Sequence, residues 1–418
     1  MNRFAPNGGR LTAAVATAAL AVPLWAAVAP DPAVAHPLGA AATTSWRVTP
    51  CPKAAGPRVS APTRPSPPAA DPVHRAVGGD LLATSGLAVP PAATPPPGVS
   101  ATSWLVADLD TGAVLGACGA HEYATPASVQ KLLLAATMIS KLDPKRVVTI
   151  TREDVDIEPG SSSVGLVEGG RYSVETLWLG LLLASGNDAA NTLARLGGGT
   201  AEAGVREMNA LAARLGAYQT HAVTPSGLDA PGQFTSAYDL ALIMRACVAE
   251  PLFQKYALTR YTQMPDQGKH HKGFQIQNQN LLIDNYPGVL GGKTGYTDLA
   301  RHTYVGAAER HGRRLVVSVL GAEYVPLRGW EQGAALLDWG FAQPADASVG
   351  RLVDSGATAA NPSAAAQAAD TPGTGTNALA DGGTGTPPLL AFGAAVAAAG
   401  LVLSAAARRR RGSRVRRH

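Results

Sequence analysis

Apolar residues recur in two patterns between residues 98 and 343, one typical of strands and one typical of helices. Residues 103–108 and 113–117 are mostly apolar, and Asp110-Thr111-Gly112 between them is a turn sequence, so this segment predicts a β-hairpin. Helical spacing recurs after Pro126, which suits the first position of a helix. The expected helices cover about residues 126–142, 177–184, 188–196, 201–215, 237–249 and 329–341. The expected later strands cover residues 292–297, 302–309 and 314–321.

This order of strands, then many helices, then strands predicts an α+β fold, which belongs to the broad α/β class. We expect one sheet built from both ends of the domain, with a helical insertion between them. Pockets are common where two such parts of a domain meet. The sequence therefore places the active site at the junction of the sheet and the helical part.

The pattern is lost on the N-terminal side of this region. Arg3 and Arg10 precede or flank an apolar stretch over residues 11–28, which predicts a secretory signal peptide covering residues 1–35. Residues 36–97 hold 14 of the 32 prolines and little apolar periodicity. We expect them to form an extended Pro/Ala-rich linker.

The C-terminal side is also divided by composition. Residues 344–386 contain few large apolar side chains and are expected to be a disordered linker, which leaves 98–343 as the single catalytic domain. Residues 389–407 carry no charge, and we place a transmembrane helix at 387–407. The arginine-rich residues 408–418 would stay cytoplasmic. This predicts a single-pass protein of the cell membrane whose catalytic domain is extracellular; an amphipathic tail and a wall-sorting signal are the alternatives.

Charge and cysteine content narrow the choice of partners. The whole chain has a net charge of +5, but residues 98–343 carry 20 Lys and Arg against 23 Asp and Glu, a net charge of −3. A domain without a basic surface gives no support to nucleic acid binding. No residue spacing indicates a zinc site, and we expect neither a metal nor a cofactor.

Three cysteines follow the predicted signal peptide. Two cysteines of an exported protein can form a disulfide, and we favour Cys51 with Cys118, although the sequence leaves the connectivity open. Cys247 lies in a helical apolar run and is expected to be a buried thiol.

The first of three short motifs is Ser128-Val129-Gln130-Lys131. The expected helix places Ser128 in its first turn, where free N–H groups favour developing negative charge. Lys131 lies three residues later on the same helix face, and the apolar residues that follow predict that it is buried. Burial lowers the pKa of a lysine, so Lys131 is expected to be the general base that activates Ser128 as a nucleophile.

The second motif, Ser185-Gly186-Asn187, falls in a break between two expected helices. Glycine ends helices and asparagine caps them, so the motif has a structural interpretation as well. With Ser128 nearby, Ser185 would relay a proton to the leaving amine, and the Asn187 amide would bind the substrate backbone. Both interpretations can hold together.

The third motif, Lys293-Thr294-Gly295, is expected on a strand. Lys293 and the Thr294 hydroxyl would bind a carboxylate, and Gly295 would let the substrate backbone approach closely. The backbone N–H groups of Ser128 and Tyr296 are candidates for an oxyanion hole. Motif sets of this kind occur in penicillin-binding proteins and class A β-lactamases.

The three motifs and their surroundings resemble the D-alanyl-D-alanine carboxypeptidases among the low-molecular-mass penicillin-binding proteins. The resemblance covers about residues 99–340, and its closest stretch is 182–191. Further similar segments are 162–166, 174–177, 208–209, 227–229, 278–282 and 286–289. The resemblance implies a serine peptidase that removes the terminal D-alanine of peptidoglycan stem peptides through an acyl-enzyme, with β-lactam antibiotics as covalent inhibitors. It also implies a fold like that of DD-peptidases and β-lactamases, a mainly antiparallel sheet flanked by helices plus an all-α lobe.

The chain departs from the family pattern at a few positions. Arg301 follows Ala300 where the family commonly has glycine, and Ser226 stands where it often has histidine. Arg301 would either add a carboxylate contact or narrow the site. A catalytically impaired wall-binding homologue is therefore one alternative. A β-lactamase-type hydrolase is a weaker one, because no Glu-x-x-Leu-Asn sequence follows the second motif.

Overall fold

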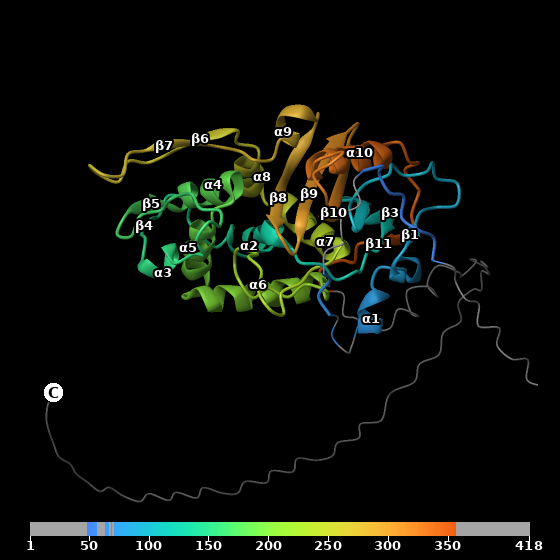
Figure 1. Cartoon of the computed structure of the whole chain (residues 1–418), viewed down its shortest axis with the longest axis horizontal. Helices are drawn as coiled ribbons and strands as arrows, with labels where there is room; N and C mark the ends of the chain where they lie inside the picture. Colours follow the sequence, from blue (N-terminus) through green and yellow to red (C-terminus); the bar gives the residue numbers. More distant parts are fainter. Residues whose placement is uncertain (1–47, 57–62, 67, 69–70, 357–418) are drawn as a thin grey trace, which may run out of the picture. The chain divides into compact units, whose positions relative to one another are not determined.

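The structure, a computed structural model, describes residues 48–56, 63–66, 68 and 71–356 (Figure 1). The predicted signal peptide, transmembrane helix and basic tail lie outside these residues. Among the helices that the structure describes, none combines the length and apolar character needed to cross a bilayer.

One antiparallel sheet organises the fold. Its strands are ordered β1-β3-β2-β10-β9-β8, and β11 also pairs with β3. The predicted hairpin is confirmed, with Trp104 opposite Cys118. Strands from the beginning and the end of the domain meet where β2 pairs with β10. The strands are β1 (Leu87–Ala88), β2 (Ser103–Asp108), β3 (Ala113–Cys118), β8 (Val289–Thr297), β9 (Arg301–Arg310), β10 (Arg313–Ala322) and β11 (Gly350–Arg351).

Helices form a second part of the molecule beside the β8 edge, and Figure 1 shows α3 to α6 grouped there. The predicted helices 201–215 and 329–341 match α6 and α10 at both ends. The longer α-helices are α2 (Lys131–Met138), α4 (Val174–Ala184), α5 (Asn187–Gly198), α6 (Ala201–Leu215), α7 (Ala237–Val248) and α10 (Gly329–Phe341). The shorter ones are α1 (Asp71–Arg75), α3 (Arg152–Val155), α8 (Pro251–Ala257) and α9 (Leu282–Asn285). Two small two-stranded sheets, β4 (Val147–Thr149) with β5 (Arg171–Ser173) and β6 (Tyr261–Met264) with β7 (Phe274–Gln277), complete this part.

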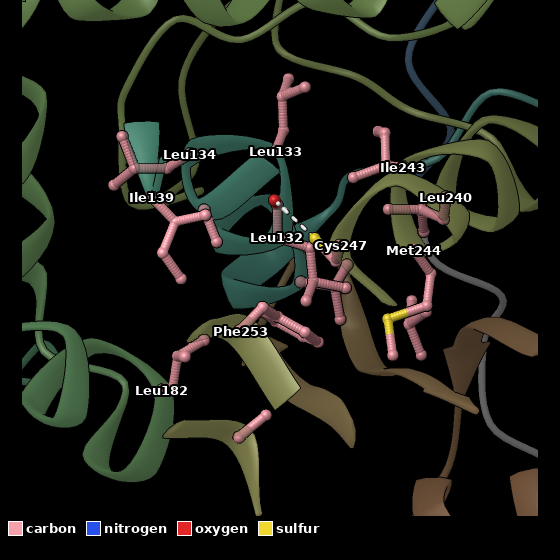
Figure 2. Close-up of a cluster of buried hydrophobic side chains, with 14 of the residues drawn as sticks. Leu132, Leu133, Leu134, Ile139, Leu182, Leu240, Ile243, Met244, Cys247 and Phe253 are labelled. Carbon is pink, nitrogen blue, oxygen red and sulfur yellow. Dashed lines mark hydrogen bonds between the residues drawn. The ribbon is translucent and has the colours of Figure 1, made fainter. Parts of the chain in front are cut away.

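Helix α2 lies at the centre of the core and contacts helices on several sides. Leu132, Leu133 and Leu134 are all fully buried, as the apolar sequence around the whole helix predicted. Figure 2 shows side chains from α4, α7 and α8 around them, and the Cys247 thiol of α7 donates a hydrogen bond of 3.2 Å to the Leu132 carbonyl. This packing fixes the start of α2, where the first motif lies.

The predicted domain boundaries are too narrow on both sides. Residues 71–97 were expected to be part of a linker, but β1 pairs with β3, and Leu82 is fully buried. Beyond residue 343, Leu352 is 1% exposed and β11 extends the sheet. These segments add single buried side chains and backbone hydrogen bonds to an existing sheet edge, so they need no apolar periodicity of their own.

The predicted disulfide is confirmed. Cys51 and Cys118 are bonded, with their Cα atoms 5.9 Å apart, and Cys247 is a buried free thiol. Lys53 forms an isolated bridge with Val99 close to the disulfide. The bond therefore joins the N-terminal arm to β3 across 67 residues of sequence.

Candidate active site

A cavity of about 450 Å³ lies between the β8 edge of the sheet and the helical part, where the sequence placed the active site. Ser128, Ser185, Asn187 and Thr294 all line it, so the structure brings the three motifs together. Two lysines, Lys131 and Lys293, lie beneath its surface and are 0% and 1% exposed.

The segment that carries Ser128 differs from the helix expected to begin at residue 126. Residues 127–130 form a 3₁₀ turn, and the α-helix begins only at Lys131. Ala127 has a φ of +50°, which is unusual for a residue with a side chain. The Thr303 hydroxyl of β9 donates a hydrogen bond of 2.9 Å to the Pro126 carbonyl and ties this turn to the sheet. Such strained backbone is common at active sites.

The Lys131 ammonium group has three hydrogen-bond partners, each 2.8 Å away: the Ser128 hydroxyl, the Asn187 Oδ1 and the Ser226 carbonyl. Burial holds the pKa of Lys131 well below its usual value, the positive charge of Lys293 lowers it further, and Asp188 partly opposes them. The deprotonated amine is therefore favoured relative to an exposed lysine.

In a neutral Lys131, the available donors and acceptors determine which group donates in the hydrogen bond with Ser128. A neutral amine has two N–H donors and one lone pair. The Asn187 Oδ1 and the Ser226 carbonyl can only accept, so they take the two donors. The lone pair is left for the Ser128 O–H, which is the arrangement that a general base needs.

The second motif lies at the junction of α4 and α5. Ser185 is the C-cap of α4 in the left-handed conformation, with a φ of +63°, and Gly186 is the N-cap of α5 without a side-chain cap bond. The predicted break between two helices is confirmed, but Asn187 is the first residue of α5 and does not cap it. The Ser185 Oγ is buried and has no hydrogen-bond partner among the described residues. The Asn187 N–H donates a hydrogen bond of 2.9 Å to the Ser162 carbonyl, and Asp188 accepts bonds from two N–H groups of the same loop, at Val164 and Leu166. These bonds hold the loop that carries Ser161 and Ser162 at the cavity wall.

The third motif lies on β8, an edge strand of the sheet, as expected. Lys293 donates a hydrogen bond of 2.7 Å to the Thr294 carbonyl, and burial lowers its pKa to about 7. Lys293 does not line the cavity in this structure, whereas Thr294 and Gly295 do. Lys293 is thus not positioned to contact a carboxylate in the cavity directly, and its amine lies beneath the strand.

Gly295 leaves room for the backbone of Ser128. A Cβ atom at residue 295 would lie 2.8 Å from the Ser128 N and 2.5 Å from the Thr303 Oγ1. A side chain would therefore displace the first motif or cover its N–H group. Tyr296, the next residue, lines the cavity and is 49% exposed.

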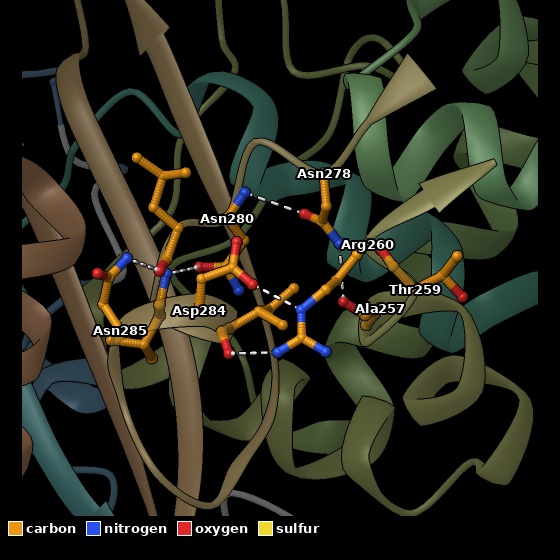
Figure 3. Close-up of polar contacts among 10 residues, drawn as sticks. Ala257, Thr259, Arg260, Asn278, Asn280, Asp284 and Asn285 are labelled. Atoms are coloured by element: carbon orange, nitrogen blue, oxygen red, sulfur yellow. Dashed lines mark hydrogen bonds and ion pairs between the residues drawn. The ribbon is translucent and has the colours of Figure 1, made fainter. Parts of the chain in front are cut away.

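The loop that leads into β8 is held by asparagine side chains (Figure 3). The Asn278 Nδ2 donates hydrogen bonds of 3.0 Å and 2.9 Å to the Ala257 and Thr259 carbonyls, and its Oδ1 accepts from the Asn280 N–H at 2.9 Å. Gln279 and Leu281 from this loop line the cavity.

Sequence reasoning missed a group of residues at the far wall of the cavity, His302, Tyr324, Arg328 and Trp330. The exposed Arg328 guanidinium lies 5.1 Å from the ring of Tyr324, and no ion pair of the described residues includes it. No short motif marks Arg328, because the β10–α10 connection brings it to the cavity only in the folded chain. A cation that lines the same cavity as Thr294 and forms no ion pair among the described residues is suited to bind an anion.

Arg301 takes neither of the roles considered for it. Its guanidinium donates two hydrogen bonds to the Glu323 carboxylate, at 3.0 Å and 2.7 Å, and Arg301 is not part of the cavity wall. Its φ of +56° explains why glycine suits this position.

The Peptidase_S11 family model, described as D-alanyl-D-alanine carboxypeptidase, matches residues 91–324. The chain is 44% identical over 273 residues to the D-alanyl-D-alanine carboxypeptidase DacB2 of Mycobacterium tuberculosis. The match covers 63% of this chain and 90% of that protein. It is 38% identical to DacD of Escherichia coli, with 59% of this chain and 64% of that protein covered.

Solved structures agree with the fold. The crystal structure of a D-alanyl-D-alanine carboxypeptidase from Mycobacterium tuberculosis is 43% identical with a TM-score of 0.59, and the match covers 63% of this chain and 99% of that chain. A mutant of the Streptomyces K15 DD-transpeptidase is 26% identical with a TM-score of 0.56, and the match covers 59% of this chain and all of that chain. The expected fold of an antiparallel sheet with helices is confirmed.

Proposed function

Because the chain belongs to the D-alanyl-D-alanine carboxypeptidase family of serine peptidases, we propose that Ser128 is its nucleophile and Lys131 its general base. The protein is a serine-type D-Ala-D-Ala carboxypeptidase of peptidoglycan. The observation that carries the residue roles is the position of the Lys131 Nζ, which lies 2.8 Å from the Ser128 Oγ and equally close to two acceptors, the Asn187 Oδ1 and the Ser226 carbonyl.

Acylation proceeds in two stages at this site. The Ser128 Oγ forms a bond to the carbonyl carbon between the two D-alanines, and its proton passes to Lys131. The C–N bond then breaks. The proton held by Lys131 passes through the Ser185 hydroxyl to the departing amine of D-alanine. The unpartnered Ser185 Oγ in the cavity wall supports this relay.

The attack places a negative charge on the carbonyl oxygen of the tetrahedral intermediate. Hydrogen-bond donors that are already in position stabilise this charge. The N–H groups of Ser128 and Tyr296 are suited to this role, and Gly295 leaves the first of them uncovered. Water then attacks the ester carbonyl and releases the shortened peptide from the Ser128 oxygen, which regains its proton.

The terminal carboxylate of the substrate is bound, in this proposal, by the Thr294 hydroxyl and Arg328. Arg328→Gln is expected to lower kcat/KM for a peptide ending in D-Ala-D-Ala by about 10- to 100-fold, the range for a hydrogen bond to a charged group. Steady-state release of D-alanine measures this effect.

The matching control is Arg146→Gln, which removes an exposed arginine outside this cavity. It should leave kcat/KM within twofold of wild type. For a substrate whose terminal carboxylate is amidated, Arg328→Gln should change kcat/KM little. Equal losses for the free acid and the amide would remove Arg328 from carboxylate binding.

The proposal is tested by incubating the full-length protein with penicillin and measuring its intact mass. A mass gain of one ring-opened penicillin, together with release of D-alanine from a stem-peptide mimic, is the expected result. Folded protein that shows neither would contradict the proposed roles of Ser128 and Lys131, and rapid turnover of penicillin would indicate a β-lactamase instead.

We also propose that the enzyme is exported and held in the cell membrane by residues 387–407, with the catalytic domain outside. The signal-like residues 1–35, the uncharged C-terminal stretch and its basic flank support this placement. The Cys51–Cys118 disulfide supports it independently, because structural disulfides persist in oxidising compartments.

A further inference from the structure

The part of the cavity wall that carries Arg328 is a short connection without regular secondary structure. It covers residues 323–328, between the end of β10 and the start of α10, which packs against β9 and β10 (Figure 1). Tyr324 and Arg328 of this connection line the cavity. Tyr324 and Val325 are each 51% exposed, so burial of their side chains does little to hold the connection in one conformation. Hydrogen bonds to its backbone therefore carry much of its positioning.

Two of these hydrogen bonds come from one side chain, that of Gln332. Gln332 is the fourth residue of α10, and it is only 1% exposed although it carries an amide. Its Nε2 donates hydrogen bonds to the Leu327 carbonyl at 2.7 Å and to the Glu323 carbonyl at 3.1 Å. These carbonyls lie near the two ends of the connection. A single buried amide thus fixes both ends relative to α10.

The oxygen of the same amide is held from the opposite side. The Gln332 Oε1 accepts hydrogen bonds from the Ser100 N–H at 3.0 Å and from the Ala101 N–H at 3.2 Å. Both residues lie just before β2, so the amide is anchored to the sheet. Because an amide oxygen only accepts and an amide nitrogen only donates, the reversed orientation would place N–H groups against each other. The amide therefore has one orientation, in which its donors face the connection.

The Ser100 hydroxyl closes this network. It lies 2.8 Å from the Gln332 Nε2, and it accepts a hydrogen bond of 2.9 Å from the Glu323 N–H. At the other end of the connection, the Arg328 N–H donates a hydrogen bond of 2.6 Å to the Glu331 carboxylate. The connection is thus held at both ends by groups that lie outside the cavity wall.

The peptide unit between Leu327 and Arg328 is held with particular completeness. Its carbonyl accepts from Gln332, and its N–H donates to Glu331. A peptide unit is planar and rigid, so these two bonds fix the plane from which the Cα atom of Arg328 extends. The direction in which the Arg328 side chain leaves the backbone therefore depends on the Gln332 amide.

We propose that Gln332 is a positioning residue for carboxylate recognition. It holds the Leu327–Arg328 peptide so that the Arg328 guanidinium reaches the same anion as the Thr294 hydroxyl. This inference rests on the proposed function, in which these two groups bind the terminal carboxylate of the substrate, and it adds the residue that aligns one of them. Without the amide, the guanidinium is displaced, and a displaced group loses the geometry that its hydrogen bonds to the substrate require.

Gln332→Met tests this role, because it removes the amide and keeps an unbranched side chain of similar size. The full-length variant is expected to lose about tenfold in kcat/KM for a peptide ending in D-Ala-D-Ala, and less than about twofold for the same peptide with its terminal carboxylate amidated. Steady-state release of D-alanine or of D-alanine amide measures both values. The ratio of the two kcat/KM values is the readout, since a loss of folded protein lowers both equally.

Two further variants separate positioning from a general effect on the fold. In an Arg328→Gln background, Gln332→Met should not change the ratio further, because no guanidinium is left to position. Ser100→Ala removes one hydroxyl of the network and keeps the Gln332 amide, and it should lower the ratio by about threefold. This milder variant decides the question if Gln332→Met does not fold.

Gln343→Met is the matched control. Gln343 lies just after α10, is also buried, and is 4% exposed. Its Nε2 donates hydrogen bonds to the Thr94 hydroxyl at 3.1 Å and to the Trp339 carbonyl at 2.9 Å, and none of these three residues lines the cavity. The control should lower the thermal stability as Gln332→Met does, and leave the ratio within about twofold of wild type.

An unchanged ratio in folded Gln332→Met would overturn the positioning role, and so would an equal fall in Gln343→Met or a further fall in the Arg328→Gln background. The single variant Arg328→Gln distinguishes this failure from failure of the proposed function. If Arg328→Gln lowers the ratio and Gln332→Met does not, only the positioning role is lost. If Arg328→Gln leaves the ratio unchanged, the proposed binding of the carboxylate by Arg328 fails, and the role of Gln332 fails with it.

Discussion

Ser128→Ala is expected to eliminate the mass gain with penicillin and to lower D-alanine release by at least about 10³-fold, because among the described residues no other hydroxyl is hydrogen-bonded to the Lys131 amine. The measurement is intact mass after incubation with penicillin, combined with an assay of D-alanine. The substitution should leave the fold intact. Lys131 keeps its bonds to the Asn187 Oδ1 and the Ser226 carbonyl, and the Ser128 hydroxyl makes no other hydrogen bond within the described structure.

Ser161→Ala is the matched control. Like Ser128, Ser161 lines the cavity, but its hydroxyl has no hydrogen-bond partner among the described residues and so no amine beside it. It should be acylated at close to the wild-type rate. If Ser128→Ala were still acylated while thermal unfolding matched wild type, the nucleophile would have to be another residue.

Lys131→Met is expected to slow acylation by about 10²- to 10⁴-fold, the contribution of a general base. Methionine keeps an unbranched chain in a fully buried position, so the change removes the amine with little effect on packing. Stopped-flow acylation by a chromogenic β-lactam, followed over a range of pH, is the measurement.

The structure also determines the direction in which the acylation rate changes with pH. Acylation requires the neutral amine, and burial lowers the pKa of Lys131, so the rate of the wild-type enzyme should rise with pH and level off well below pH 10.5. Lys131→Met should lose this rise. Lys53→Met is the control, since Lys53 is a partly buried lysine with a lowered pKa outside the cavity. Unchanged acylation in Lys131→Met would assign the base elsewhere.

The elements that the sequence predicts best are those whose apolar pattern continues through most of their length. Residues 103–108, 201–215 and 329–341 match the structure at both ends: the strand is buried at every position, and the two helices carry apolar residues into their last turn. The β6–β7 hairpin was not predicted. Its strands, Tyr261–Met264 and Phe274–Gln277, are short and largely polar, and they pair with each other at the surface.

The three motifs located the groups at the cavity that we propose to be catalytic, because each motif requires particular residue types at a fixed local spacing. Distances between motifs and the exact backbone of Ala127 depend on tertiary contacts, such as the bond from Thr303 to the Pro126 carbonyl. Arg328 could not be found in this way. It reaches the cavity from a separate connection, and a lone arginine carries no local signal.

The two ends of the folded chain meet at the sheet edge that is farthest from catalysis. The Arg351 N–H donates a hydrogen bond of 2.8 Å to the Gly78 carbonyl, and β1 and β11 both pair with β3. Four inter-strand spacings, on the order of 19 Å, separate β3 from β8. A circular permutant that joins these ends would leave the β8 edge of the sheet unchanged. Enzyme immobilised through either end would have its active-site cavity facing away from the support.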